Sequence, residues 1–227
     1  MEWNSIGGQT QKVRHIKIKA GSWNVYFIYF VSAILFLISS PVMGFYPAGL
    51  IAFVPFFVYL GYSRDRYKDG FVFGCLLGCC SFYFILTMDE GNMLMKAGVF
   101  ACIVIISGFE FLLFGFLFLI SEKNLFQKAL TDIMIALAAG CFEFALDSIY
   151  MGFHISIGYT QFDNLWIAPI VKYIGQYGVS ILVFYVNILL ARIVLSFLKN
   201  QPASIVRNIL PNLMILVSIL LVLVTSP

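Results

Sequence analysis

The sequence predicts an all-α membrane protein, a bundle of about seven transmembrane helices with a cytoplasmic N-terminus and an extracytoplasmic C-terminus. Three observations predict this fold. Of the 227 residues, 61% are hydrophobic and 11% are charged, against about 25% charged in an average soluble domain. The mean hydropathy of +0.95 indicates that lipid surrounds most of the chain. The apolar residues form long runs, and most basic residues lie in alternate segments between them.

A membrane-spanning helix needs about 20 mostly apolar residues, and seven stretches meet or approach this length. They are residues 23–40, 47–62, 70–87, 97–120, 129–150, 170–198 and 208–225. The first is too long for the apolar part of a secretory signal, and no small-residue cleavage site follows it. The second is short and contains Pro55. We therefore predict a basic cytoplasmic segment over residues 1–22 and one transmembrane domain over residues 23–227.

The basic residues predict the orientation. Twelve of the 14 lysines and arginines fall on one side of the predicted bundle, and Lys96 and Lys172 fall on the other. The twelve are Lys12, Arg14, Lys17, Lys19, Arg64, Arg66, Lys68, Lys123, Lys128, Arg192, Lys199 and Arg207. Cytoplasmic segments carry the excess of basic residues, so this side is predicted to face the cytoplasm.

Two irregular segments fall together on the opposite, outer side. Residues 151–169 contain two glycines, a proline and several aromatic residues, and Pro41–Pro47 contains two prolines and a glycine. Irregular backbone near lipid requires cover from protein or a watery cavity. We predict that the two segments pack together as the mouth of a groove open to the outer leaflet. The alternative is an ordinary flexible surface loop.

A few polar residues lie inside the predicted spans, where a carboxylate costs about 2.5–3.5 kcal/mol. Glu143 and Asp147 are four residues apart and share a helix face. With His154 they are predicted to line a polar cavity, or else Glu143 is a hydrogen-bonded packing residue and Asp147 reaches interfacial water. In the groove hypothesis, Glu143 accepts hydrogen bonds from backbone amides of 151–169 or from Tyr159. Asn187 is predicted to bridge helices, and Glu110 has no predictable partner.

The cysteines give no sign of a metal site. Cys75, Cys79, Cys80, Cys102 and Cys141 all fall in predicted spans, without histidines at ligand spacing. Buried cysteines usually behave as small hydrophobic residues. We predict no metal and no cofactor.

Several short motifs in the second half of the chain point to a family. They read Glu143-Phe144-Ala145-Leu146, Gly152-Phe153-His154-Ile155, Gly158-Tyr159-Thr160-Gln161 and Gly175-Gln176-Tyr177-Gly178-Val179-Ser180, followed by Asn187. In this order and spacing they resemble the membrane domain of bacterial apolipoprotein N-acyltransferases. Ser40-Pro41, Tyr46-Pro47-Ala48 and Lys68-Asp69-Gly70-Phe71 resemble its first three spans more loosely. The chain departs from the family at Leu146, where the family has arginine, and at His154-Ile155, where it has Pro-Trp.

The resemblance implies a bacterial inner-membrane, multi-pass protein of the lipoprotein N-acyltransferase system. Members of this family continue into a nitrilase-like domain with a Glu-Lys-Cys triad, for which the sequence offers no counterpart. We therefore expect a lipid-binding domain or subunit without catalytic residues, inactive alone. Its expected partners are phospholipid and a separately encoded catalytic chain, and no nucleic acid. The expected binding residues are Glu143, Asp147, Gly152, Phe153, His154, Gly158, Tyr159 and Gln161.

Two other functions compete with this one. The chain could be a non-catalytic anchor or scaffold for a separate enzyme, such as a polyprenol-phosphate glycosyltransferase docked on the basic inner loops. It could also be a small transporter, but the sequence has no visible internal repeat and few intramembrane charges.

Overall fold

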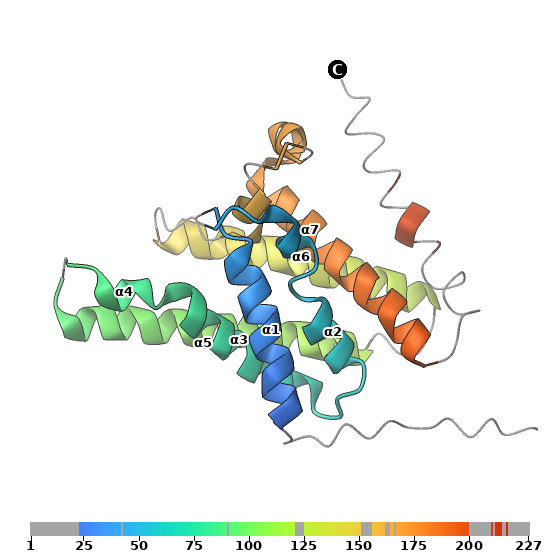
Figure 1. The fold of residues 1–227 in the computed structure, drawn as a ribbon, viewed down its shortest axis with the longest axis horizontal. Coiled ribbons are helices and arrows are strands. Elements are labelled where there is room, and N and C mark those ends of the chain that lie inside the picture. The colour runs from blue at the N-terminus through green and yellow to red at the C-terminus, as the bar shows by residue number, and fades with distance from the viewer. Residues whose placement is uncertain are drawn as a thin grey trace, which may run out of the picture.

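A computed structural model gives the fold of the chain (Figure 1). It describes residues 23–41, 43–89, 91–120, 125–150, 156–161, 164–165, 167–199, 210, 212–214 and 217. Within these residues every regular element is a helix, which confirms the predicted all-α class. The elements are α1 (Trp23–Ile38), η1 (Tyr46–Leu50), α2 (Val54–Leu60), α3 (Arg66–Phe82), α4 (Phe84–Thr87), α5 (Met93–Ile120), α6 (Leu125–Tyr150), η2 (Ile157–Gln161) and α7 (Ala168–Leu198).

Among the described residues, four helices are long and apolar enough to cross a membrane. They cover Arg66–Thr87, Met93–Ile120, Ala129–Ser148 and Pro169–Leu198, in line with four of the predicted spans. The first two predicted spans correspond to the shorter apolar helices Val25–Ile38 and Tyr46–Leu60. Most of the predicted span 208–225, and the whole basic segment 1–22, lie outside the described residues.

The second predicted span is divided into two pieces. η1 and α2 each carry a proline in their first turn, Pro47 and Pro55, and the backbone between them leaves the helical path at residues 51–53. Proline has no backbone N–H and cannot continue the hydrogen-bond ladder of a preceding helix. The break leaves backbone groups that other parts of the protein must satisfy.

Glycines bring α3 and α5 into close backbone contact, and Figure 1 shows the two helices side by side. A Cβ atom built on Gly70 would lie 2.1 Å from the carbonyl oxygen of Phe111, and one on Gly74 would lie 2.2 Å from that of Ser107. On the opposite helix, a Cβ atom on Gly115 would lie 2.2 Å from the carbonyl oxygen of Arg66. Small residues at such spacing allow helix backbones to approach closely in lipid.

An aromatic cluster joins this helix pair to α2 and α7. The rings of Phe56 and Phe73 stack with centroids 4.1 Å apart, and those of Phe53 and Phe184 stack at 5.1 Å. Phe111 contacts both stacks, and all five side chains are fully buried. Such ring pairs contribute about 0.5–1.5 kcal/mol each beyond the burial of their area.

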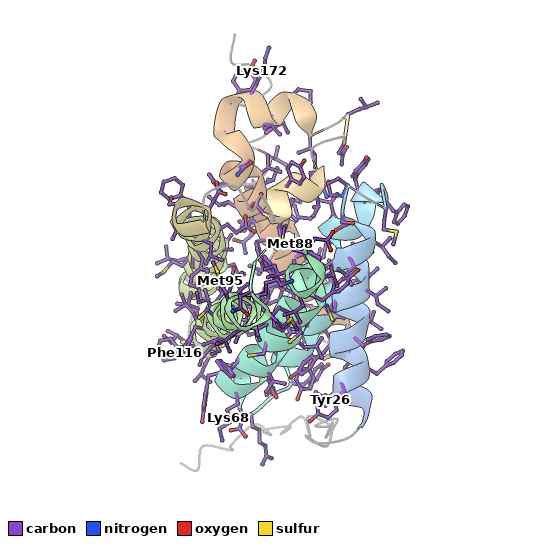
Figure 2. The ribbon with its side chains drawn as sticks, turned by 90° about the vertical axis from the view of Figure 1, so that its left-hand side faces the viewer. Tyr26, Lys68, Met88, Met95, Phe116 and Lys172 are labelled. Carbon is purple, nitrogen blue, oxygen red and sulfur yellow. The ribbon has the colours of Figure 1, made fainter. Side chains whose placement is uncertain are left out.

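An ion pair between Arg192 of α7 and the buried Asp132 of α6 joins these two helices, and it also contacts Phe118 near the end of α5. Arg192 Nη2 donates to Asp132 Oδ1 at 2.8 Å, and the guanidinium lies 4.0 Å from the centroid of the Phe118 ring. On α3, Arg66 Nη1 donates to the carbonyl oxygen of Phe118. Lys68 lies at this end of the molecule, and Lys172 lies at the opposite end (Figure 2).

α7 is interrupted near its start. Gly175 has φ 68° and ψ 177°, so residues 168–174 form a separate helical piece before the long part of the helix. The two pieces run in different directions (Figure 1). The left-handed φ favours glycine, because a Cβ atom would be strained there. This break was not predicted from the sequence.

Candidate functional site

The candidate site is a layer of polar side chains around the two irregular segments, η1 and η2. Gly49 of η1 lies against Gln161 of η2, where a Cβ atom on the glycine would come within 2.6 Å of Gln161 Nε2. Gln161 Nε2 also donates to the carbonyl oxygen of Tyr46 at 2.8 Å, across 115 residues of sequence. The described parts of the two segments therefore pack against each other.

Asn187 of α7 satisfies the broken backbone between η1 and α2. Its Oδ1 accepts from the backbone N–H of Phe53 at 2.8 Å, and its Nδ2 donates to the carbonyl oxygen of Gly49 at 2.9 Å. The side chain is completely buried. A single amide thus supplies both the donor and the acceptor that the break requires, which is the bridging role expected of an amide in lipid.

Glu143 and Ser180 hold η2 against α6 and α7. Glu143 Oε1 accepts from the backbone N–H of Ile157 at 2.8 Å, and Ser180 Oγ accepts from that of Gly158 at 2.7 Å. Gly158 lies so close to α7 that a Cβ atom on it would be 2.1 Å from the carbonyl oxygen of Gln176. Of the two donors predicted for Glu143, the backbone amide is the one used.

Two more carboxyl groups flank Glu143. Asp147, one turn along α6, accepts a hydrogen bond from the hydroxyl of Tyr177 on α7. Glu110 on α5 is buried, with 7% of its surface exposed, and lies within electrostatic range of the Glu143 carboxyl. No partner of Glu110 could be predicted, because the crossing of α5 and α6 cannot be derived from the hydrophobic pattern.

The predicted site residues fall into two groups. Glu143, Asp147, Gly158, Tyr159 and Gln161 lie together around η2, and Gly152, Phe153 and His154 lie outside the described residues. Gly158 and Gln161 are buried, whereas 38% of the Tyr159 surface is exposed.

Sequence reasoning gave Ser180 and Tyr177 no role in the site. Both follow the break at Gly175 in α7, at a spacing of three residues. Residues three apart lie on the same side of a helix, and this pair faces α6 and η2. The sequence does contain one indication of their role: polar residues recur about once per turn on one face of an otherwise apolar helix.

The arrangement serves to hold backbone in place. The side chains of Glu143, Ser180, Gln161 and Asn187 each bond to backbone groups of a non-α segment. These bonds keep two irregular segments at the end of a membrane bundle, where unsatisfied backbone would cost several kcal/mol per group. Tyr159 and the 87% exposed Leu165 face outward beside them.

Comparison with known proteins places the chain in a family. The apolipoprotein N-acyltransferase N-terminal domain matches residues 32–189, a range that includes η1, η2 and the four residues that hold them. An apolipoprotein N-acyltransferase of Geobacter metallireducens is 25% identical over 185 residues, covering 78% of this chain. The chain spans 35% of the length of that relative. No solved structure matches. Because the domain match covers well over half of the chain, the protein belongs to the family defined by the apolipoprotein N-acyltransferase N-terminal domain.

Proposed function

We propose that this chain is a phospholipid-binding membrane domain related to the lipoprotein N-acyltransferase system. The layer formed by η1 and η2 is, in this proposal, the mouth of a groove open to the outer leaflet. The observation that carries the proposal is the bonding of two irregular segments to each other and to α6 and α7. Non-helical backbone at membrane depth is tolerated where protein covers it or where it lines a cavity, and we propose that these two segments do so at the edge of a lipid-binding groove.

The exposed side chains around the mouth suit the headgroup region. Tyr159 and Tyr173 are 38% and 50% exposed. Lys172, the sequence neighbour of Tyr173, lies at the end of the molecule (Figure 2). Tyrosine is enriched where the membrane meets water, because its ring is apolar and its hydroxyl is polar. A phospholipid at the mouth would meet these rings first.

Acyl transfer itself is assigned to a separate catalytic chain in this proposal. Glu143, Ser180, Gln161 and Asn187 are engaged with backbone groups. Covalent acyl transfer requires instead a nucleophile activated by an adjacent base. The family relationship supports a role in the same system, with this chain holding and orienting lipid for its partner.

Photo-labelling with lipid tests the groove. A photo-reactive phospholipid should label the peptide containing Tyr159 more strongly than the one containing Phe116, a lipid-exposed residue of α5. Glu143→Ala removes the acceptor of the Ile157 amide, a loss of about 1–3 kcal/mol. It should lower labelling at Tyr159 at least about fivefold, since 1.4 kcal/mol is a factor of ten.

Two variants control this measurement. Glu143→Gln keeps a side-chain oxygen for the Ile157 amide and should retain most of the labelling. Ser148→Ala, on the same helix, removes only a hydroxyl that bonds to its own helix at Phe144, and should change nothing. Equal labelling at Tyr159 and Phe116 that does not change in Glu143→Ala would contradict the groove. It would show that this region is an ordinary surface loop.

The orientation in the bacterial inner membrane is also a proposal. We place the end that carries Lys68 in the cytoplasm and the end that carries Lys172 outside, in keeping with the excess of basic residues on one side. Each lysine is exposed and suits replacement by cysteine. In spheroplasts, a membrane-impermeant maleimide should label Lys172→Cys, and should label Lys68→Cys only after the membrane is opened. The unsubstituted chain controls for its own five cysteines, and the reverse labelling order would invert the topology.

A further inference from the structure

The first piece of α7, residues 169–174, packs differently from the long part of the helix after the break. None of its six residues is buried. In the long part, Val179, Ser180 and Val183 are completely buried. Segments with few buried side chains open at a lower free energy than the core on which they rest. Residues 169–174 are therefore the part of α7 that is best able to move by itself.

Gly175 provides a hinge at the end of this segment. Its φ of 68° and ψ of 177° lie in a region that glycine alone enters readily. A Cβ atom built there would have no atom of the described residues within 4 Å, apart from its chain neighbours and the backbone of its own helix. The backbone at Gly175 can therefore rotate without displacing a packed neighbour. At the other end, Asn164 Nδ2 donates to Gln161 Oε1 at 2.9 Å and keeps the chain close to η2.

The inner face of this segment rests on apolar side chains. Val171 and Ile174, with the preceding Ile167, pack against the buried cluster that contains Ile157 of η2. Their spacing of four and three residues places them on one face of a helix. Ile174 also reaches across the break, because a Cβ atom built on Gly178 would lie 2.6 Å from the Cβ atom of Ile174. This contact holds the segment in its present position.

The position of the segment suits a cover. Figures 1 and 2 show it beyond η2, at the end of the molecule that carries Lys172. In η2, Ile157 is 5% exposed and Tyr159 is 38% exposed. If the inner face swings outward beside lipid, its apolar side chains meet acyl chains that are as apolar as the cluster they leave. Opening therefore exchanges one apolar contact for another.

We propose that residues 169–174 form a lid that turns about Gly175 and admits lipid to the layer beneath it. This rests on the proposed lipid groove and adds the way in which lipid enters it. The structure shows the closed position, in which Ile174 lies on Gly178. In the open position an acyl chain reaches Ile157, whereas Tyr159 is accessible in both positions.

A disulfide across the break tests the lid. Ile174→Cys and Gly178→Cys are combined in a chain whose own five cysteines are replaced by alanine. The two Cβ atoms start 2.6 Å apart, and a disulfide holds them about 3.5–4.5 Å apart, so a shift of about 1 Å suffices. In phospholipid nanodiscs, oxidation should lower photo-lipid labelling of Ile157 at least about fivefold, because it removes the open population. A reducing agent should restore the labelling, and neither single cysteine variant should respond to the oxidant.

Gly175→Ala should produce the opposite change. Alanine is strained at the φ and ψ of the closed hinge, and rotation to the helical region relieves this strain. That rotation moves the segment away from its closed position, so labelling of Ile157 should rise about fivefold. Gly98→Ala in α5, where a Cβ atom is equally unobstructed, is the matched control and should leave the labelling unchanged.

The outcomes distinguish the lid from the groove. Unchanged labelling of Ile157 in the oxidised double variant, with the disulfide verified by mass spectrometry, overturns the lid. A Gly175→Ala variant that is labelled like Gly98→Ala also overturns it. In both cases, stronger labelling of Tyr159 than of Phe116 would still support the groove. Equal labelling of Tyr159 and Phe116 in the unsubstituted chain overturns the groove and the lid with it.

Discussion

Gly74→Leu is expected to lower the unfolding temperature by about 10 °C, because it forces α3 and α5 apart. A Cβ atom at position 74 would lie 2.2 Å from the carbonyl oxygen of Ser107 and 2.9 Å from the Cα atom of Gly108. These are backbone atoms, which cannot rotate away as the end of a side chain can. Overpacking of this kind costs about 1–3 kcal/mol and more where the backbone must move, and 1 kcal/mol corresponds to about 2–4 °C in a chain of this size.

The neighbouring helix provides a matched control. Gly98 lies in α5, and a Cβ atom built there would have no atom of the described residues within 4 Å, apart from its chain neighbours and the backbone of its own helix. Gly98→Leu should leave the unfolding temperature unchanged or raise it slightly, because leucine is a better helix former than glycine. Thermal unfolding in the same detergent compares the two variants. A similar decrease in both would show that leucine, and not the close approach of α3 and α5, is responsible.

Asn187→Leu is expected to cost about 3 kcal/mol, and about 6–12 °C in unfolding temperature. Leucine has a similar size, but it leaves the N–H of Phe53 and the carbonyl of Gly49 without partners in the interior. Each buried group left unsatisfied costs about 1–3 kcal/mol. The break between η1 and α2 would lose both of its side-chain bonds at once.

A second substitution separates the two bonds. Asn187→Asp keeps an acceptor for Phe53, but when ionised it loses the donor to Gly49 and buries a carboxylate. Its unfolding temperature should therefore be low at neutral pH and rise at lower pH, where the protonated carboxyl can again donate to Gly49. Val194→Leu, at a 37% exposed position of α7, controls for the change in side-chain size. If Asn187→Leu were as stable as Val194→Leu, the amide would not be holding the break.

The sequence predicted the helical class and most helix positions, because apolar length alone decides which segments can cross lipid. It also predicted the bridging role of Asn187, and it left two possible donors to Glu143, a backbone amide of residues 151–169 or Tyr159. The amide of Ile157 proved to be the donor. In these cases a polar residue in an apolar helix has few possible uses, and backbone groups are the commonest partners.

The remaining features depend on how helices meet. The electrostatic interaction between Glu110 and Glu143 depends on the crossing of α5 and α6, on which apolar periodicity gives no information. The break at Gly175 lies in a continuous apolar run, and glycine is common in membrane helices without such a break. The bond from Gln161 to Tyr46 joins residues 115 positions apart, and a single sequence contains no signal for such a pair.

The bonds of Asn187 set an order for the biogenesis of the protein. Its partners Gly49 and Phe53 precede it by 138 and 134 residues, so the ribosome completes η1, α2 and the four helices α3 to α6 before this amide exists. α3 and α5 are consecutive long helices and can close against each other through their glycines as soon as both are synthesised. The early chain therefore contains a finished hairpin beside a segment whose backbone is still unsatisfied. Insertion of α7 completes that segment, because Asn187 then supplies its missing donor and acceptor.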